Sequence, residues 1–318
     1  MKKTLYLSLA LLVFASCNTE NKSINAKIDF DGVTESIKPG DNFFEHVNKT
    51  WLDNAVIAED QVGVGSYSFL NIPQQKLLQN ILTEVSSTDH KKGSIEQKVG
   101  DFYSSGMDVK TINERGISPI KPILKEIDGI KNSASLMRFV TNQLTNGNYS
   151  IIGLSVSPDN ENSSVNILHF SQSGTGLPDK DYYFRTDDRT KVIQDAYKNY
   201  LTTLFTLASD KNPTKSAATV YNIEKQLAAS HKNRVERRNI KANYNKLAVS
   251  AINKKHANIG WTNMLNQLNL KADFVDVKQP KYYETLNKML KSVSIADWKT
   301  YLKAGTLSTY ADLLSKPF

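Results

Sequence analysis

Apolar residues recur at helical spacing over most of this chain, and no other sequence feature restricts the fold as strongly. After Pro39 and Gly40, Asp41 is expected to cap a helix on which Phe43 and Trp51 share one face. The same period predicts further helices around 70–85, 99–103, 120–127 and 136–144, and at 188–209, 214–231, 244–256, 281–293 and 295–315.

One region departs from the helical period. Residues 149–157 and 163–171 are rich in Val, Ile and aromatic residues, and the turn-like PDNENS joins them, so they predict a β-hairpin. The expected fold is therefore mainly α, a large helical domain with one minor β-hairpin. A chain of 318 residues, 40% of them hydrophobic and 23% charged, has the composition of a soluble globular protein with one large or two smaller domains.

The first residues, MKKTLYLSLALLVFASC, have the pattern of an export signal. Two lysines precede a short apolar stretch from Leu5 to Phe14, which is shorter than the ~20 residues that a membrane-spanning helix needs. A small residue directly before Cys17 resembles a bacterial lipoprotein signal, which would be removed as residues 1–16 and leave Cys17 lipidated. The alternative is an ordinary signal peptide with an incidental cysteine. Cys17 is the only cysteine, so it has no intramolecular disulfide partner.

The polar residues 17–38 would then be a flexible tether that joins the lipid to the fold of an exported, cell-envelope protein. Loss of residues 1–16 lowers the formal charge from +8 to +6, since only two lysines are removed. Such a basic balance can indicate nucleic-acid binding. The densest basic stretch, 232–241, contains Glu236 and is interpreted as a solvated helix end, so we expect no nucleic-acid partner.

Familiar catalytic and metal motifs are missing from the sequence. No two of its five histidines lie three to five residues apart, so no helix face offers a paired imidazole site; they are His46, His90, His169, His231 and His256. The sequence contains no G-x-S-x-G, no phosphate loop and no dinucleotide fingerprint. The carboxylates around residues 179–188 are expected to cap helices rather than to form a glycosidase pair.

Six segments carry a resemblance to a known family. They are DNFFEHVNKTWLDNAVIAED (41–60), KVGDFYSSGMDVKTINERGISPIKPILKEI (98–127), SQSGTGLPDKDYYF (171–184), YNIEKQLAAS (221–230), VERRNIKANYNKL (235–247) and the closing Trp298-x-x-Tyr301-Leu302. In this order and spacing they resemble the N-terminal region of the neprilysin family of zinc metallopeptidases, which includes endothelin-converting enzymes and bacterial oligopeptidases. The residues expected to be its structural signature are Phe43, Phe44, Trp51, Phe102, Tyr103, Gly176, Leu177, Pro178, Asp181, Tyr182, Tyr183 and Glu224.

The resemblance implies that residues 39–318 are an incomplete helical domain, which in complete enzymes helps to enclose a cavity that admits only short peptides. The zinc ligands and catalytic glutamate of the family lie in its C-terminal half, so no catalytic or metal-binding residue can be assigned here. No cofactor is expected in this chain, and zinc is expected in the complete enzyme. The family's substrate-binding arginine has no counterpart in QVGVGSYSF (61–69), and Gly106 stands where a family cysteine would fall.

The chain is therefore expected to be inactive alone. The last helix, YADLLSKPF, lacks a C-cap glycine, which indicates a truncated gene, a frameshift or a fragmentary gene model. The expected partner is the missing catalytic half or a separate gene product that supplies it, with peptide substrates only for the complete enzyme. The alternative is a stand-alone surface lipoprotein that binds peptides or a protein partner; a carbohydrate-binding lipoprotein has only composition in its favour. A fragment should leave a large apolar patch exposed, whereas an independent module should close its core.

Overall fold

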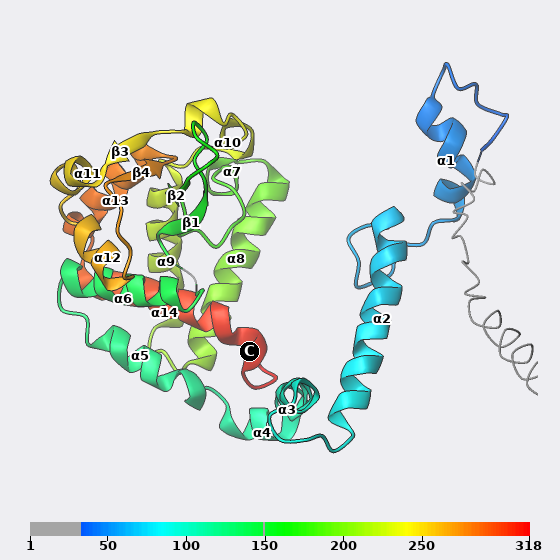
Figure 1. The fold of residues 1–318 in the computed structure, drawn as a ribbon, viewed down its shortest axis with the longest axis horizontal. Helices are drawn as coiled ribbons and strands as arrows, with labels where there is room; N and C mark the ends of the chain where they lie inside the picture. Colours follow the sequence, from blue (N-terminus) through cyan, green and yellow to red (C-terminus); the bar gives the residue numbers. More distant parts are fainter. Residues whose placement is uncertain (1–32, 149) are drawn as a thin grey trace, which may run out of the picture. The chain divides into compact units, whose positions relative to one another are not determined.

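The computed structural model describes residues 33–148 and 150–318 (Figure 1), and the chain divides after Gly100 into two compact units. Residues 1–16 and Cys17 lie outside the described residues, so the lipoprotein signal stays a prediction. Within the described part of the chain, no helix has both the length and the apolar character needed to cross a bilayer.

The first unit contains α1 (Phe43–Asn54), α2 (Ser66–Ser86) and the first turn and a half of α3 (Ile95–Met107). Asn42, and not the expected Asp41, caps α1, because its side chain accepts a hydrogen bond from the Glu45 amide at 3.1 Å. At Gly100, a Cβ atom would lie 2.9 Å from the Val85 carbonyl oxygen. The glycine thus allows α3 to approach the end of α2.

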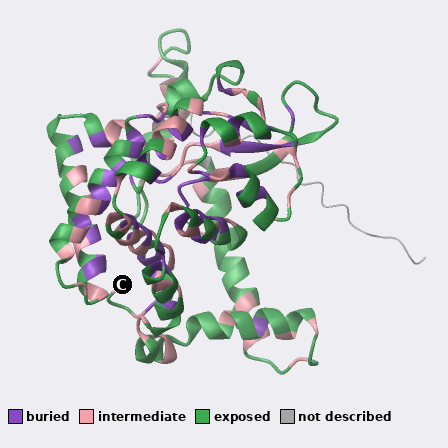
Figure 2. Cartoon of the chain, turned by 90° about the vertical axis from the view of Figure 1, so that its left-hand side faces the viewer, coloured by how far each residue is buried: buried purple, intermediate pink, exposed green. Residues whose placement is uncertain are grey.

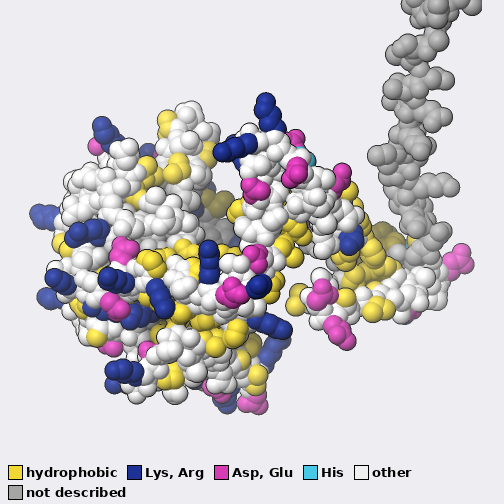
Figure 3. All heavy atoms as spheres, turned by 90° about the horizontal axis from the view of Figure 1, so that it is seen from below, with side chains coloured by type: hydrophobic (Ala, Val, Ile, Leu, Met, Phe, Trp, Pro, Cys, Tyr) yellow, Lys and Arg dark blue, Asp and Glu magenta, His cyan; other side chains and the backbone are white. Residues whose placement is uncertain are grey.

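The apolar stripes of the first unit are present but exposed. Among residues 33–100 whose burial the structure describes, only Gly100 is buried. Figure 3 shows hydrophobic side chains, in yellow, at the molecular surface. Those of this unit include Phe43 and Phe44 on α1 and, on α2, Phe69, Leu70, Ile72, Leu77, Leu78 and Ile81, of which Leu70 is 61% exposed.

The second unit holds the other helices. They are α4 (Val109–Arg115), η1 (Ser118–Ile120), α5 (Lys121–Asp128), α6 (Ser133–Thr145), α7 (Asp181–Phe184), α8 (Asp188–Leu207), α9 (Pro213–Ala228), α10 (Arg234–Arg237), η2 (Lys241–Asn243), α11 (Val249–Lys255), α12 (Trp261–Gln267), α13 (Pro280–Ser292), α14 (Ile295–Tyr310) and η3 (Ala311–Leu313). The starts of α8, α9, α13 and α14 fall within one residue of prediction, because a proline at the first position or a capping side chain marks each start.

Ser118 does not cap the helix that follows it. Its hydroxyl donates to the Arg115 carbonyl at 2.6 Å, and a 3₁₀ turn leads from it into α5. A serine hydroxyl that bonds back to the preceding turn is not available to the amides ahead of it. α5 ends at Asp128, one residue beyond the predicted end, and Gly129 is its C-cap.

The sheet has four strands in the order β1-β2-β4-β3. The predicted hairpin is β1 (Gly153–Pro158) paired antiparallel with β2 (Asn166–Ser171). β4 (Phe274–Val277) runs parallel to β2, and β3 (Lys246–Ala248) runs antiparallel to β4. The sheet is therefore larger than the expected hairpin, and β3 occupies residues assigned to the predicted helix 244–256. Three- and four-residue strands are too short to show an alternating pattern.

Helices and sheet enclose a core that lies wholly in the second unit (Figure 2). Buried apolar side chains of the described chain run from Ile120 to Leu314. Phe170 on β2 contacts Trp261 edge-on, with ring centroids 4.8 Å apart, and Tyr283 packs against both. The fold class, mainly α with a minor sheet, is confirmed.

Candidate functional site

The segment 171–184 connects β2 to α7 and α8, and two glycines determine its path. Gly174 has a φ of +86°, and the Tyr301 hydroxyl donates to its carbonyl oxygen at 2.9 Å. At Gly176, a Cβ atom would lie only 2.0 Å from the Tyr197 hydroxyl oxygen. Any side chain at position 176 would therefore displace Tyr197.

Glu224, on α9, is the polar centre around which this segment folds. The Tyr183 hydroxyl donates to Glu224 Oε2 at 2.8 Å, and the Tyr197 hydroxyl donates to Oε1 at 2.9 Å. The Tyr183 hydroxyl also accepts from the Leu177 amide at 3.0 Å. Glu224, which is only 3% exposed, thus holds α7 and α8 to residues 171–180, which we call the signature loop.

The electrostatics of this cluster follow from its burial. Burial raises the pKa of Glu224 to about 7, and the hydrogen bonds from Tyr183, Tyr197 and the Gly176 backbone lower it by less. Burial also raises the pKa of Tyr183 and of Tyr197 well above that of free tyrosine, so both hydroxyls stay protonated donors. Within the described residues, no basic side chain forms an ion pair with Glu224.

Two hollows flank the cluster. A cavity of about 140 Å³ lies against Glu224 and Tyr197 and extends to α14. An open groove of about 520 Å³ runs along α7, the start of α8 and α10, and includes Asp181 and Tyr182. Two carboxylates of the groove accept from the local backbone: Asp187 caps α8 through the Thr190 amide at 3.0 Å, and Asp179 accepts from the Asp181 amide at 3.1 Å. The Asp181 carboxylate instead pairs with Arg185 at 3.2 Å.

The structure brings together only part of the predicted signature. Leu177 and Tyr183 are buried beside Glu224, while Pro178 is exposed, and Asp181 and Tyr182 are half-buried. The other signature residues lie elsewhere: Phe43, Phe44 and Phe102 are exposed, Tyr103 is half-buried, and Trp51 packs edge-on against Phe69 at 6.5 Å between ring centroids. Phe184 is 44% exposed, and the Lys225 ammonium group lies over its ring.

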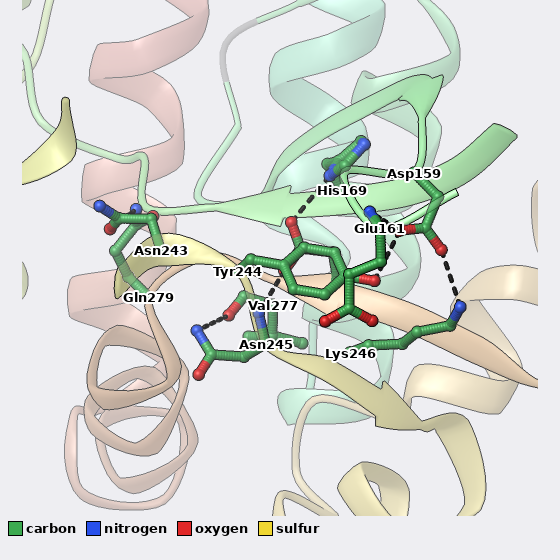
Figure 4. Close-up of polar contacts among 10 residues, drawn as sticks. Asp159, Glu161, His169, Asn243, Tyr244, Asn245, Lys246, Val277 and Gln279 are labelled. Atoms are coloured by element: carbon green, nitrogen blue, oxygen red, sulfur yellow. Dashed lines mark hydrogen bonds and ion pairs between the residues drawn. The ribbon is translucent and has the colours of Figure 1, made fainter. Parts of the chain in front are cut away.

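A second polar cluster joins the hairpin to β3 and β4 (Figure 4). Asp159 accepts from the Tyr244 hydroxyl at 2.6 Å and from Lys246 Nζ at 2.7 Å, and these bonds hold the pKa of Asp159 well below its usual range. His169 Nδ1 donates to Asp276 at 2.8 Å. Asp276 also accepts from the Asn245 amide at 2.7 Å, so these contacts fasten strands and do not form an open site.

Sequence reasoning missed Tyr197 and this second cluster. Tyr197 is 27 residues from Glu224, and Tyr244 is 85 residues from Asp159. No local pattern relates partners that far apart, so neither contact had a sequence signal.

No group of three or more His, Cys, Asp or Glu side chains in the described part of the chain could hold a metal ion. His231 packs against the ring of Tyr282, and its Nε2 lies 3.2 Å from the Ser173 carbonyl oxygen. His169 is engaged by Asp276. The geometry so far describes a packed structural motif flanked by two hollows.

Comparisons with known proteins identify what the chain is similar to. A family model described as Peptidase family M13 matches residues 39–318. Endothelin-converting enzyme-like 1 of Mus musculus is 23% identical over 301 residues, and neprilysin-3 of Drosophila melanogaster is 25% identical over 307 residues. Each match covers 89% of this chain but only 38% and 39% of those two proteins.

A solved structure agrees with the sequence matches. The Mycobacterium tuberculosis zinc metalloprotease ZMP1 in complex with an inhibitor superposes with a TM-score of 0.83 at 26% identity. The superposition covers 91% of this chain and 45% of that one, so the present chain spans less than half the length of each of these proteins.

Proposed function

The chain belongs to peptidase family M13, and we propose that residues 39–318 are the helical, substrate-restricting part of an exported zinc metalloendopeptidase. In the complete enzyme, a metal-activated water would attack the peptide carbonyl with a glutamate as general base. The residues for that step would come from a second half of the protein or from a separate gene product. The part described here would limit which peptides reach them.

One observation carries this proposal. The family match extends over residues 39–318, yet the described residues contain no group that could hold a metal ion. Zinc peptidases keep three protein ligands and an open position for water. A chain of this family without such a group fits the role of a non-catalytic region.

The exposed apolar helices of the first unit support a partner. Soluble monomers rarely leave contiguous apolar patches of more than a few hundred Å² uncovered. Leu77 and Leu78 are 59% and 58% exposed on α2. We propose that the catalytic half, or the gene product that supplies it, covers this face.

The test compares residues 17–318 alone with the same protein mixed with the catalytic half of a complete family member. We expect the chain alone to bind no stoichiometric zinc by elemental analysis and to cleave no fluorogenic peptide. The mixture should cleave in a chelator-sensitive way. Stoichiometric zinc and chelator-sensitive cleavage by residues 17–318 alone would overturn the proposal.

The second candidate is a surface lipoprotein that binds peptides or a partner without catalysis. The closed core of the second unit favours it, because that unit buries its own apolar residues. The mass of the native protein, isolated from its membrane with an antibody against residues 171–184, separates the two. A product larger than 35.6 kDa favours the peptidase. For a product of about that mass or less, a zinc-containing partner that is isolated with it favours the peptidase, and the absence of such a partner favours the lipoprotein.

The proposed anchor has its own test. Labelled fatty acid should be incorporated into the native chain and not into Cys17→Ser. Equal incorporation into both would contradict lipidation at Cys17.

A further inference from the structure

We propose that the cavity beside Glu224 binds the ammonium group of a small primary alkylamine. This site lies within the second unit and is independent of whether the chain restricts substrates. The argument rests on the position of the cavity, the charge of its wall, its aromatic lining and its size.

The cavity lies where three helices meet. α8 contributes Tyr197 and Tyr200, α9 contributes Glu224, and α14 contributes Tyr301, Ala304 and Ser308. The Tyr200 hydroxyl is 2.9 Å from the Ser308 hydroxyl, which joins α8 to α14 at the rim. Since the wall is built from long helices, the cavity is a fixed feature of the fold.

The charge of the wall selects a cation. Apart from three tyrosines, Glu224 is the one ionisable residue that lines the cavity. No lysine, arginine or histidine lines it. The Glu224 carboxylate accepts one tyrosine hydrogen bond on each oxygen and a third from the Gly176 backbone, which leaves one of its about four lone-pair sites for a further donor. A buried carboxylate without a basic partner is costly, and an ammonium ion at hydrogen-bond distance would offset that cost.

The remaining lining suits an alkylammonium rather than a bare metal ion. Tyrosine rings attract cations and also offer apolar surface to a short hydrocarbon stem. Three tyrosines line the cavity, together with the methyl group of Ala304. The hydroxyl oxygens of Tyr200 and Ser308 add two acceptors for a group that has three N–H donors.

The size of the cavity limits the ligand. A volume of about 140 Å³ corresponds to roughly four or five water molecules at ~30 Å³ each. That volume accommodates an amine of about five non-hydrogen atoms, so n-butylammonium is the appropriate probe. At the highest binding free energy per non-hydrogen atom that small ligands reach, a ligand of about five such atoms binds no more tightly than a Kd of about a few micromolar.

The charge state of Glu224 gives the proposal a pH signature. Titratable groups that face Glu224 are Tyr183 from α7, Tyr197 from α8, Tyr221 from its own helix and Tyr301 from α14 through Tyr197. The pKa values of Tyr183, Tyr197 and Tyr221 are raised above that of free tyrosine, so these three hydroxyls stay neutral between pH 5 and 8, while the carboxyl group changes charge. With a pKa of about 7, its ionised fraction at pH 5 is on the order of a hundredth of that at pH 8.

The experiment titrates n-butylammonium into the full chain at pH 8 and pH 5 and follows binding by NMR and by the shift in thermal midpoint. We expect saturable binding at pH 8, binding at least about tenfold weaker at pH 5, and no binding of butanol or butyrate. No saturable binding at pH 8, or equal binding of butanol, would overturn the proposal.

Two variants locate the site. Glu224→Gln should abolish binding because it removes the charge, while Glu284→Gln, which removes a half-exposed carboxylate on α13, should bind as the parent does. If Glu224→Gln fails to fold, Ala304→Met fills the cavity and leaves the Glu224 hydrogen bonds in place. Binding that survives in Ala304→Met would overturn the proposal.

Discussion

At the residue scale, Glu224 and His231 are two buried titratable groups, and they make stability depend on pH in opposite directions. The pKa of Glu224 is raised from 4.5 to about 7, so the folded protein keeps a proton that the unfolded chain has lost. Its contribution to stability is fully present below pH 4.5 and is lost as pH rises through 7. The free energy of unfolding of the parent should therefore fall by up to about 3 kcal/mol between pH 4.5 and 7 because of this group. Glu224→Gln should remove that decrease.

Urea unfolding at half-unit steps of pH measures this dependence. Glu284→Gln is the matched control, because Glu284 pairs with Lys255 and its pKa is lowered, which puts its titration below this window. An unchanged slope between pH 4.5 and 7 in Glu224→Gln would show that the buried carboxyl is not the titrating group.

His231 titrates in the opposite sense. Burial lowers its pKa from 6.5 to about 4, and its neutral ring donates from Nε2 to the Ser173 carbonyl oxygen. Its contribution is present above pH 6.5 and is lost as pH falls through 4. His231→Gln keeps an N–H donor for the Ser173 carbonyl but cannot take up a proton. It should therefore abolish a loss of about 2–3 kcal/mol in the free energy of unfolding between pH 6.5 and 4.

The free energy of unfolding between pH 4 and 6.5 tests this prediction. His90→Gln, in the first unit, should leave the unfolding of the second unit unchanged. The prediction is wrong if His231→Gln retains the acid sensitivity of the parent.

At the element scale, Gly176 determines how closely the signature loop approaches α8. In Gly176→Ala, the new methyl group would lie 2.0 Å from the Tyr197 hydroxyl oxygen and 2.6 Å from Tyr197 Cζ. Tyr197 must then move and loses its hydrogen bond to Glu224. We expect a loss of about 1–3 kcal/mol in the free energy of unfolding.

Gly106→Ala is the control for that change. Gly106 lies inside α3, with nothing within 4 Å of a new Cβ atom, so alanine should stabilise by about 0.5–1 kcal/mol. Urea midpoints of the two variants should move in opposite directions. Equal, small shifts would mean that the loop and α8 are not in close contact.

Elements differed in how far their sequences determined them. Long helices such as α8 and α13 were predictable, because many apolar positions and a clear first residue define each of them. β3 was not predictable from the sequence, because it has only three residues, directly precedes α11, and pairs with β4, about thirty residues later in the chain. Asn42 caps α1 in place of Asp41, because it directly precedes the helix and its side chain accepts from the Glu45 amide.

At the scale of the whole molecule, the candidate site depends on contacts that no local pattern encodes. The sequence singled out Gly176, Tyr183 and Glu224 through family resemblance. It did not provide the second donor, Tyr197, or the cavity between α8, α9 and α14, because both depend on how helices pack. Resemblance located the residues, and packing determined what they could do.

The distribution of buried residues leads to a prediction about folding. Every buried apolar side chain of the described chain lies between Ile120 and Leu314, inside the unit that begins at Asp101. Since burial of apolar surface is the dominant favourable term in folding, residues 101–318 should unfold cooperatively without residues 1–100. Their thermal midpoint should lie within a few degrees of that of the full chain.

Residues 33–100 should behave in the opposite way. They bury no apolar side chain in the described structure, so as an isolated peptide they should show no cooperative transition. Calorimetry of the two pieces and of the full chain tests both statements. If residues 101–318 melt without a heat-absorption peak, the first unit contributes to the core in a way that its exposed apolar side chains do not indicate. If residues 33–100 melt cooperatively, their apolar faces must cover one another, and the partner proposed for α2 would have no surface left to bind.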